Sequence, residues 1–437
     1  MLLKDWCYTS FDLKIRYNVS CSGKYKFLSR PFKFSLDEKY RKLENFKKLI
    51  FLNWEIKSLP SNVNFEIIKS IERIKSKKFK KIMFQFPEGF HVFFRILNRI
   101  FTVSMNVIER ISISNTITYG ACCIEDSMGE AIGFDLLIHY GHSCLVPVSN
   151  CFIPIMYIFL EIKFDFSFLT ENLKCYFFLQ KNKILFSSTI QFVSTLKHIK
   201  KNTCAYFKFF IPKNNRPLSP GEVLGCTGYE KKNFHTFLYL GDGRFHLESI
   251  IISNFNGRFL QFNPYCKTLS IVGFKTLHLL YEREKSLKNS LKNRENFGYI
   301  LSSLGRQSGT LFQKRLLDLN SKSQVSFAIA IMGEINFDKL EIIGKKFIGS
   351  WVQVACPRLS LDWSHCFKKS ILTTFEISVI LGLTKWKISN FPMDYYKSKS
   401  GFWSNYSKIE SLFKFNLNNI KPGEKKFKRI CQINERK

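Results

Sequence analysis

A chain of 437 residues, of which 45% are hydrophobic and 23% charged, has a globular composition and is long enough for two or three domains. Its 13 cysteines are odd in number and irregularly spaced, which excludes a disulfide scaffold and favours reduced thiols in the cytoplasm. The net charge of +33 suits an acidic or RNA-associated partner, but Lys and Arg are scattered through every segment, so direct nucleic-acid binding is not expected.

The sequence also lacks the signals of a membrane protein. It contains no run of about 18 uncharged apolar residues, and charges at Lys4, Asp5 and Lys14 interrupt the N-terminus. We therefore expect neither a membrane span nor a signal peptide.

The predicted elements divide the chain into five parts. A basic N-terminal extension (1–58) without clear periodicity precedes three α/β units (59–160, 161–277 and 278–396), and a basic tail (397–437) ends the chain.

The first unit alternates strand and helix patterns. The elements are a strand at 81–86, a helix at 91–101, a strand at 111–115, a helix at 124–133 and a strand at 135–141. This β-α-β-α-β order predicts a parallel sheet covered by helices. Glu125 and Asp126 fall at the start of a helix, where acidic residues are favourable, and we expect no catalytic role for them.

The second and third units repeat this pattern less regularly. The second has a strand at 183–188, a helix at 189–201, a strand at 204–212, a loop at 219–228 and a strand at 236–243. The third has a connector helix at 279–296, a strand at 299–305, a helix at 310–320, a strand at 325–332, a helix at 337–343 and a strand at 351–356. The predicted fold is α/β, with three related Rossmann-like units and parallel sheets.

Each unit offers one cysteine near the carboxyl end of a strand, where open α/β sheets bind their ligands. These residues are Cys122, Cys226 and Cys356. Three thiolates from three units could hold a 4Fe-4S cluster and leave one iron open. Zinc is the alternative, but the sequence contains no C-x-x-C pair.

Several alternatives remain open at this point. Cys144 holds in the first unit the place that Cys356 holds in the third, so the residues alone do not choose between Cys122 and Cys144. His139 and His142 are either metal ligands or structural imidazoles, and Cys144 with His142 is a possible nucleophile pair. A lone cysteine after a strand is most often a small buried core residue.

Motifs over about 59–396 resemble the catalytic-subunit family of eukaryotic diphthamide synthase, the 2-(3-amino-3-carboxypropyl)histidine synthase subunit 1 family. The motifs include "PEGF", "ITYGACCIEDSMGEAIGFDLLIHYGHSCLVPV", "PLSPGEVLGCT", "LGRQSG" and "WVQVACPRLSLDW". The resemblance implies three α/β units around a central 4Fe-4S cluster. Its ligands are the cysteines of "YGAC", "LGCT" and "ACPR", which selects Cys122, Cys226 and Cys356 and decides against Cys144.

The resemblance also implies a reaction. S-adenosylmethionine binds at the open iron, and its 3-amino-3-carboxypropyl group moves by a radical route to a histidine of translation elongation factor two, the first step of diphthamide biosynthesis. The implied partners are a related second synthase subunit in a heterodimer and a small electron-donor protein. The implied protein contribution is positioning and electrostatics, with no acid-base catalytic residue.

Polar residues in loops at the same strand ends are the expected contacts of S-adenosylmethionine. They are Arg306, Gln307, Arg358 and Asp362, with Asp242 and Arg244 as further candidates. Arginine pairs with a carboxylate in a fork and aspartate pairs with an ammonium group. The alternative for these side chains is that they brace neighbouring loops. The alternative for the whole protein is a basic nucleic-acid or ribosome-binding protein whose cysteines are structural or hold zinc.

Overall fold

The computed structural model describes residues 36–114, 120–143, 145–176, 183–203, 208–213, 218–231, 233–292, 296–303, 305–307, 312, 327–344, 347–386, 391–397 and 400–405. The predicted helix at 310–320 therefore lies almost wholly outside the described residues, and Cys144 lies outside them too. The chain divides into two parts after Phe51, and all three large sheets belong to the second part.

The N-terminal region contains a helix that the sequence did not reveal. Helix α1 (Leu36–Lys57) has large apolar side chains exposed at Leu49, Ile50 and Trp54, so its apolar residues do not form the single face that predicts a helix. Near its end, the buried Glu55 accepts a hydrogen bond from Arg99 at 2.9 Å.

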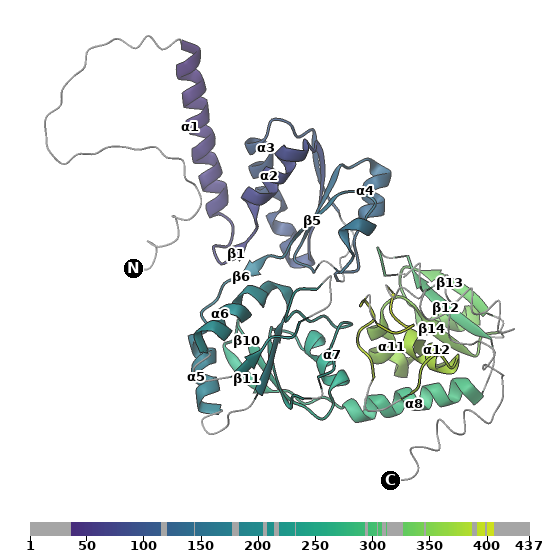
Figure 1. Cartoon of the computed structure of the whole chain (residues 1–437). Coiled ribbons are helices and arrows are strands. Elements are labelled where there is room, and N and C mark those ends of the chain that lie inside the picture. The colour runs from purple at the N-terminus through teal and green to yellow at the C-terminus, as the bar shows by residue number, and fades with distance from the viewer. Residues whose placement is uncertain are drawn as a thin grey trace. The chain divides into compact units, whose positions relative to one another are not determined.

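The first α/β unit is a four-stranded parallel sheet with helices on both faces (Figure 1). Its elements are β1 (Val63–Asn64), α2 (Ile67–Lys77), β2 (Lys81–Gln85), η1 (Glu88–Phe93), α3 (Phe94–Ser104), β3 (Arg110–Ile113), α4 (Asp126–Ile132), β4 (Leu136–Tyr140), η2 (Val148–Asn150) and β5 (Ile155–Ile158). Alternate residues of the central strands point to opposite faces: Phe84 and Ile138 pack with α2 and α3, whereas Met83 and Leu137 pack on the face of α4. Strands covered on both faces are apolar throughout, as parallel sheets require.

The second unit contains a five-stranded sheet. Its elements are β6 (Glu161–Ile162), α5 (Ser167–Tyr176), β7 (Lys183–Ser188), η3 (Ile190–Phe192), α6 (Val193–Thr203), β8 (Lys208–Phe210), β9 (Thr236–Leu240), α7 (Phe245–Ser253), β10 (Arg258–Asn263) and β11 (Thr268–Ile271). Strand β11 pairs antiparallel with β10, and the other neighbours are parallel. Strands β1 and β6 form a separate antiparallel pair.

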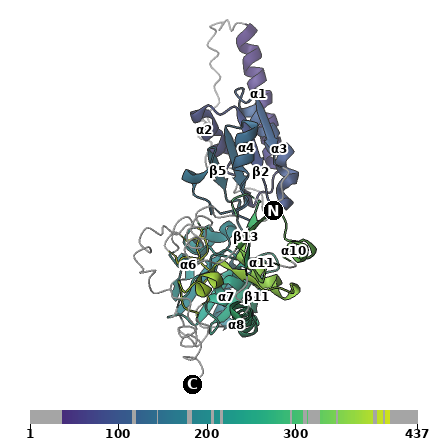
Figure 2. The ribbon, with the colours of Figure 1, turned by 90° about the vertical axis from the view of Figure 1, so that its right-hand side faces the viewer.

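The third unit contains a four-stranded parallel sheet. Figure 1 labels its strands β12, β13 and β14, and Figure 2 labels β13 together with α10 and α11. Its elements are α8 (Thr276–Lys292), β12 (Phe297–Ser302), β13 (Phe327–Met332), α10 (Phe337–Gly344), β14 (Ser350–Gln353), α11 (Pro357–Trp363), η4 (Ser364–Cys366), β15 (Ile371–Thr373) and α12 (Thr374–Ile380). The predicted connector helix is α8.

The three sheets share one strand order, which confirms the predicted α/β fold of related units with parallel sheets. The orders are β3-β2-β4-β5, β8-β7-β9-β10 and β13-β12-β14-β15, so in each sheet the strand that comes first in the chain lies between the second and the third. Sheets of this doubly wound type bind ligands beyond the carboxyl ends of the strands. The boundaries predicted at residues 58, 160, 277 and 396 stay predictions.

Candidate active site

The three predicted cysteines come from different sheets and lie near one another. Cys122 is in the connection between β3 and β4, Cys226 in the connection between β8 and β9, and Cys356 directly before α11. A hydrogen bond with Cys123 and burial raise the pKa of Cys122 well above its ordinary value, and the charges of Cys356 and Cys226 add to this shift. Burial and the neighbouring Cys356 raise the pKa of Cys226. Thiols more than a hundred residues apart in sequence thus share one electrostatic environment.

One apolar cluster from all three units supports these thiols. Its buried members are Ala121, Leu145, Leu218, Ile252, Leu280, Leu287, Leu361, Phe375, Val379, Phe391, Met393, Tyr395 and Tyr396. Cys122 and Cys226 pack against it. The core at which the units meet therefore packs beneath Cys122 and Cys226 and supports their loops.

The donor set suits a cluster of several metal atoms. All three cysteines are free and keep some solvent exposure, and thiolates are the ligands that iron–sulfur clusters use. Within the described ranges, no three His, Cys, Asp or Glu side chains are close enough to hold a single metal ion. A cluster does not need that closeness, because each thiolate binds a different iron atom. A zinc ion, by contrast, binds all of its ligands directly, at 2.0–2.3 Å.

One of the two predicted histidines, His139, supports the loop that carries Cys122 through Gln85. Gln85 Oε1 lies 2.8 Å from His139 Nδ1, and Gln85 Nε2 donates to the Cys123 carbonyl at 2.8 Å. Burial lowers the pKa of His139 well below its ordinary value and lowers that of His142 to about 4. Both imidazoles are therefore neutral near pH 7, a form that suits a structural imidazole and a metal ligand alike. The proposed pairing of His142 with Cys144 falls outside the described residues.

Some buried polar atoms near the strand ends have no hydrogen-bond partner in the described part of the chain. They include His139 Nε2, Ser188 Oγ and His246 Nδ1. Burial lowers the pKa of His246 to about 4, and the charges of Arg358 and His142 contribute to this shift. His246 therefore lies near residues of the first and the third unit. Buried polar groups are nearly always paired, so these atoms are candidates for ligand contacts. Sequence reasoning missed Ser188, the last residue of a predicted strand, and His246, which follows a predicted strand.

Arg306 and Gln307 contact the first unit. Arg306 Nε donates to Asp126 Oδ1 at 3.0 Å and Nη2 to Asp126 Oδ2 at 2.5 Å. Gln307 Nε2 lies 3.2 Å from Cys123 Sγ. These partners are the ones expected if Arg306 and Gln307 brace neighbouring loops. Asp126 pairs with Arg306, a role that its position at the start of a helix did not predict.

Arg358 is buried between the second and third units. Its Nε donates to Asp362 Oδ2 at 3.0 Å, its Nη1 to the Phe245 carbonyl at 2.8 Å and its Nη2 to Glu248 Oε2 at 2.5 Å. Asp362 stays 29% exposed, and its burial raises the pKa of its carboxyl.

The further candidates Asp242 and Arg244 are exposed. Arg244 Nη2 lies 3.9 Å from Glu248 Oε1, beyond hydrogen-bonding distance.

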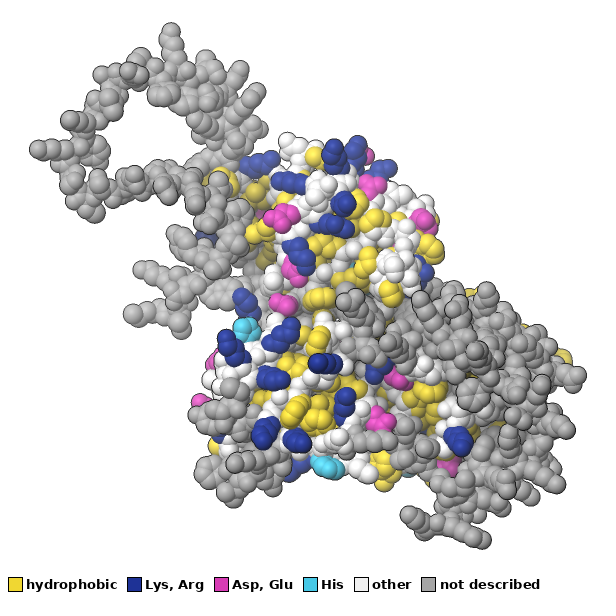
Figure 3. All heavy atoms as spheres, in the orientation of Figure 1, with side chains coloured by type: hydrophobic (Ala, Val, Ile, Leu, Met, Phe, Trp, Pro, Cys, Tyr) yellow, Lys and Arg dark blue, Asp and Glu magenta, His cyan; other side chains and the backbone are white. Residues whose placement is uncertain are grey.

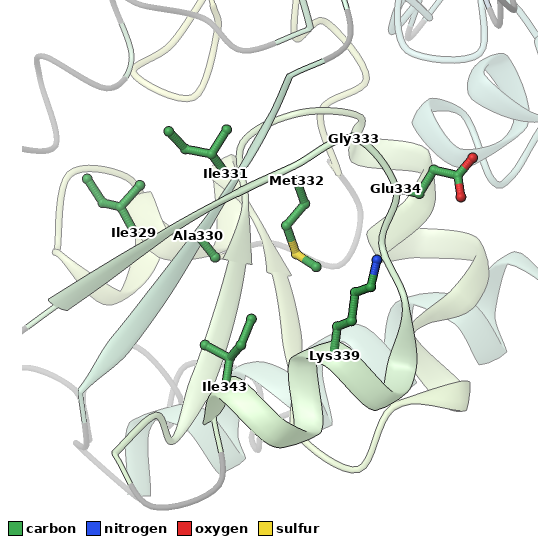
Figure 4. Close-up of a pocket in the computed structure, with 8 residues that line it drawn as sticks. All are labelled: Ile329, Ala330, Ile331, Met332, Gly333, Glu334, Lys339 and Ile343. Carbon is green, nitrogen blue, oxygen red and sulfur yellow. The ribbon is translucent and has the colours of Figure 1, made fainter.

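A cavity of about 410 Å³ opens elsewhere, beside β13 and α10 (Figure 4). Its lining is mostly apolar, with Glu334 and Lys339 as the charged side chains, and it contains none of the predicted site residues. The chemistry of the cysteines, and not the size of this cavity, therefore identifies the candidate site.

Comparison with known proteins assigns the chain to a family. The family model described as putative diphthamide synthesis protein matches residues 86–392. The chain belongs to this family. The 2-(3-amino-3-carboxypropyl)histidine synthase subunit 1 of Dictyostelium discoideum is 38% identical over 400 residues, covering 89% of this chain and 82% of the relative. The human protein of the same name is 37% identical over 358 residues, covering 80% and 79%.

A solved structure has a similar fold. Dph2 from Pyrococcus horikoshii with a 4Fe-4S cluster is 26% identical, has a TM-score of 0.60 and aligns with 76% of this chain and 94% of its own. This chain therefore shares its fold with a protein whose structure was solved with such a cluster.

Two surface features bear on the alternatives. Lys and Arg side chains are spread over the face shown in Figure 3 and do not form one patch. None of the described helices combines the length and apolarity that crossing a bilayer demands.

Proposed function

We propose that this protein holds a 4Fe-4S cluster through Cys122, Cys226 and Cys356 and transfers the 3-amino-3-carboxypropyl group of S-adenosylmethionine to a histidine of translation elongation factor two. The observation that carries the proposal is the meeting of three cysteines from three α/β units, in a family with a cluster-containing member. The reaction is the first step of diphthamide biosynthesis.

When bound through Cys122, Cys226 and Cys356, the cluster would supply the electron for radical cleavage of the sulfonium carbon–sulfur bond, which leaves methylthioadenosine as the other product. The chain's own thiols must release their protons to act as ligands. Their raised pKa values mean that the apo site holds them as thiols, so ligand binding and proton release are coupled.

The remaining residues bind and orient the substrate. Gln307 and Asp362 stay proposed contacts, and the exposed edge of Asp362 suits the α-ammonium group. Arg306 and Arg358, which the sequence predicted as further contacts, pair with Asp126 and Glu248 of the protein itself. His142 and His246 are neutral at pH 7 and do not repel the cationic sulfonium. The apolar cluster beneath Cys122 and Cys226 excludes water from the 3-amino-3-carboxypropyl group as it reacts.

The proposal includes partners. The name subunit 1, carried by the similar proteins, implies a complex of several subunits. We propose a heterodimer with a related second subunit, a small electron-donor protein and a cytoplasmic location. The strongly basic composition favours an acidic or ribosome-associated protein substrate.

The test is anaerobic incubation with dithionite, elongation factor two and S-adenosylmethionine labelled in the aminocarboxypropyl carbons, with and without the second subunit. We expect label on one histidine of the factor, and none on a variant in which that histidine is alanine. Label in methylthioadenosine, or no transfer in any combination, would refute the proposed reaction.

A further inference from the structure

We propose that Arg306 and Arg358 are positioning residues that clamp the cysteine loops of different α/β units together and so set the spacing of the three thiols. The inference deepens the proposed function and rests on it.

The two arginines are built into matching arrangements. Each comes from the third unit, lies over a phenylalanine ring of another unit and pairs with a carboxylate in a helix of that unit. The Arg306 guanidinium is 4.1 Å from the ring centre of Phe152 and pairs with Asp126 of α4. The Arg358 guanidinium is 4.3 Å from the ring centre of Phe245 and pairs with Glu248 of α7.

The first clamp joins the Cys122 loop to the third unit. The Arg306 N–H donates to the Cys122 carbonyl at 2.8 Å, so backbone and side chain hold the same loop. Gly305 allows this approach: its φ is +45°, and a Cβ there would lie 2.8 Å from the Cys123 Cα. Only a glycine brings the two backbones this close.

The second clamp joins the loops of Cys226 and Cys356. Arg358 stands two residues after Cys356, and its partner Phe245 lies against Gly225, the residue before Cys226. A Cβ at Gly225 would lie 2.2 Å from the Phe245 ring. The two clamps therefore connect all three cysteine loops through the third unit.

Burial makes these pairs strong constraints. Asp126 is fully buried and also accepts the Phe152 N–H at 2.8 Å, and Arg358 is 4% exposed. Removing one member of such a pair leaves an unpaired charge in the interior, unlike breaking an exposed pair. The Arg358 fork is moreover filled by Asp362, Glu248 and the Phe245 carbonyl, so a substrate carboxylate would have to displace protein partners.

The test uses Arg306→Lys and Arg358→Lys, which keep the charge and lose the bidentate fork. Wild type and variants are reconstituted anaerobically, and three quantities are measured: the rate of iron loss to a chelator, the electron paramagnetic resonance spectrum of the reduced cluster, and the KM for S-adenosylmethionine of the loaded fraction. We expect iron loss about 10–100-fold faster, as for other residues that support metal ligands, an altered spectrum and a KM within about twofold of wild type.

Matched variants control for folding. Arg99→Lys alters an arginine paired with an equally buried carboxylate, Glu55, away from the cysteines, and should retain iron like wild type. If Arg306→Lys does not fold, Asp126→Asn tests the first clamp by removing the charge of its carboxylate. If Arg358→Lys does not fold, Phe245→Leu tests the second clamp by removing its aromatic ring.

The outcomes separate the two proposals. Unchanged iron retention with a KM raised at least about tenfold would overturn the clamps and make these arginines substrate contacts. Faster iron loss in Arg99→Lys as well would also overturn the inference, since any buried ion pair would then have the same effect. A wild-type chain that takes up no iron would refute the proposed function itself.

Discussion

Arg283 is the most deeply buried cation in the described part of the chain, and its replacement by methionine should destabilise the third α/β unit strongly. Its side chain and that of Glu376 are both fully buried. Arg283 Nε donates to Glu376 Oε1 at 2.7 Å, and its Nη1 and Nη2 donate to the carbonyls of Ser360 at 2.8 Å and Ile371 at 2.7 Å. One side chain thus ties α8 to α11, β15 and α12.

Arg283→Met fills most of the volume but leaves the Glu376 carboxylate without its cation and two buried carbonyls without a donor. Breaking a buried pair from one side costs about 3–5 kcal/mol, and each unsatisfied carbonyl about 1–3 kcal/mol before relaxation. Because such terms are not additive, we expect a loss of about 4 kcal/mol in the free energy of unfolding. Urea denaturation, followed by tryptophan fluorescence and circular dichroism, measures it.

A second variant separates charge from volume. Glu376 also accepts the Thr373 N–H in a capping box, a role that glutamine can fill. Arg283→Met/Glu376→Gln should therefore recover at least about 1 kcal/mol relative to the single variant. Lys368→Met, which breaks an exposed pair with Glu341, should cost less than about 1 kcal/mol. A single variant as stable as Lys368→Met, or a double variant less stable than the single, would refute the reasoning.

Two further predictions concern the loops of the site. Burial raises the pKa of Glu222 from 4.5 to about 7, so its contribution to stability is complete below pH 4.5 and is lost as the pH rises through 7. The free energy of unfolding of Glu222→Gln should therefore rise by about 2–3 kcal/mol relative to that of wild type between pH 5 and pH 8, as measured by urea denaturation at both pH values. If the difference between variant and wild type is the same at both pH values, the Glu222 carboxyl is not linked to proton binding. Gly305→Ala should cost at least about 1–2 kcal/mol, because φ there is +45°. Gly243→Ala, which meets no atom within 4 Å, is its control in thermal unfolding, and equal losses would contradict the strain argument.

Hydrophobic periodicity predicted most of the sheets because their central strands are covered on both faces. All five residues of β4 are buried, as are all five of β9. The pattern failed for helices that are buried on every side. Helix α7 contains the consecutive buried residues Ile250, Ile251 and Ile252, which show no helical period. Strands β10 and β15 were not predicted either. β10 follows α7, and β15 follows α11 and η4, and none of these helices was predicted from periodicity.

The choice of cysteine illustrates what single-sequence physics lacks. Cys122 and Cys226 precede the third strand of their sheets, whereas Cys356 follows the third strand of its sheet. Equivalence with Cys356 would have selected Cys144, and equivalence with Cys226 selects Cys122. The units are related in strand order but do not place their cysteines at equivalent positions, so family resemblance was needed to decide.

The polar contacts were the least predictable part of the site. Arg306 and Asp126 are 180 positions apart, and Arg358 and Glu248 are 110 apart. A sequence shows that an arginine stands in a loop at a strand end, but not which carboxylate another unit brings to it. The prediction of a substrate carboxylate as partner stays a prediction.

The central claim is that three distant thiols hold one cluster, and the most direct measurement is the iron, zinc and acid-labile sulfide content of anaerobically reconstituted protein. Wild type should contain about four irons and four sulfides per chain, and Cys122→Ala, Cys226→Ala and Cys356→Ala should each lose most of both. Cys366→Ala, which alters an exposed cysteine, should match wild type. Zinc without sulfide in wild type, or full iron in all three alanine variants, would contradict the account.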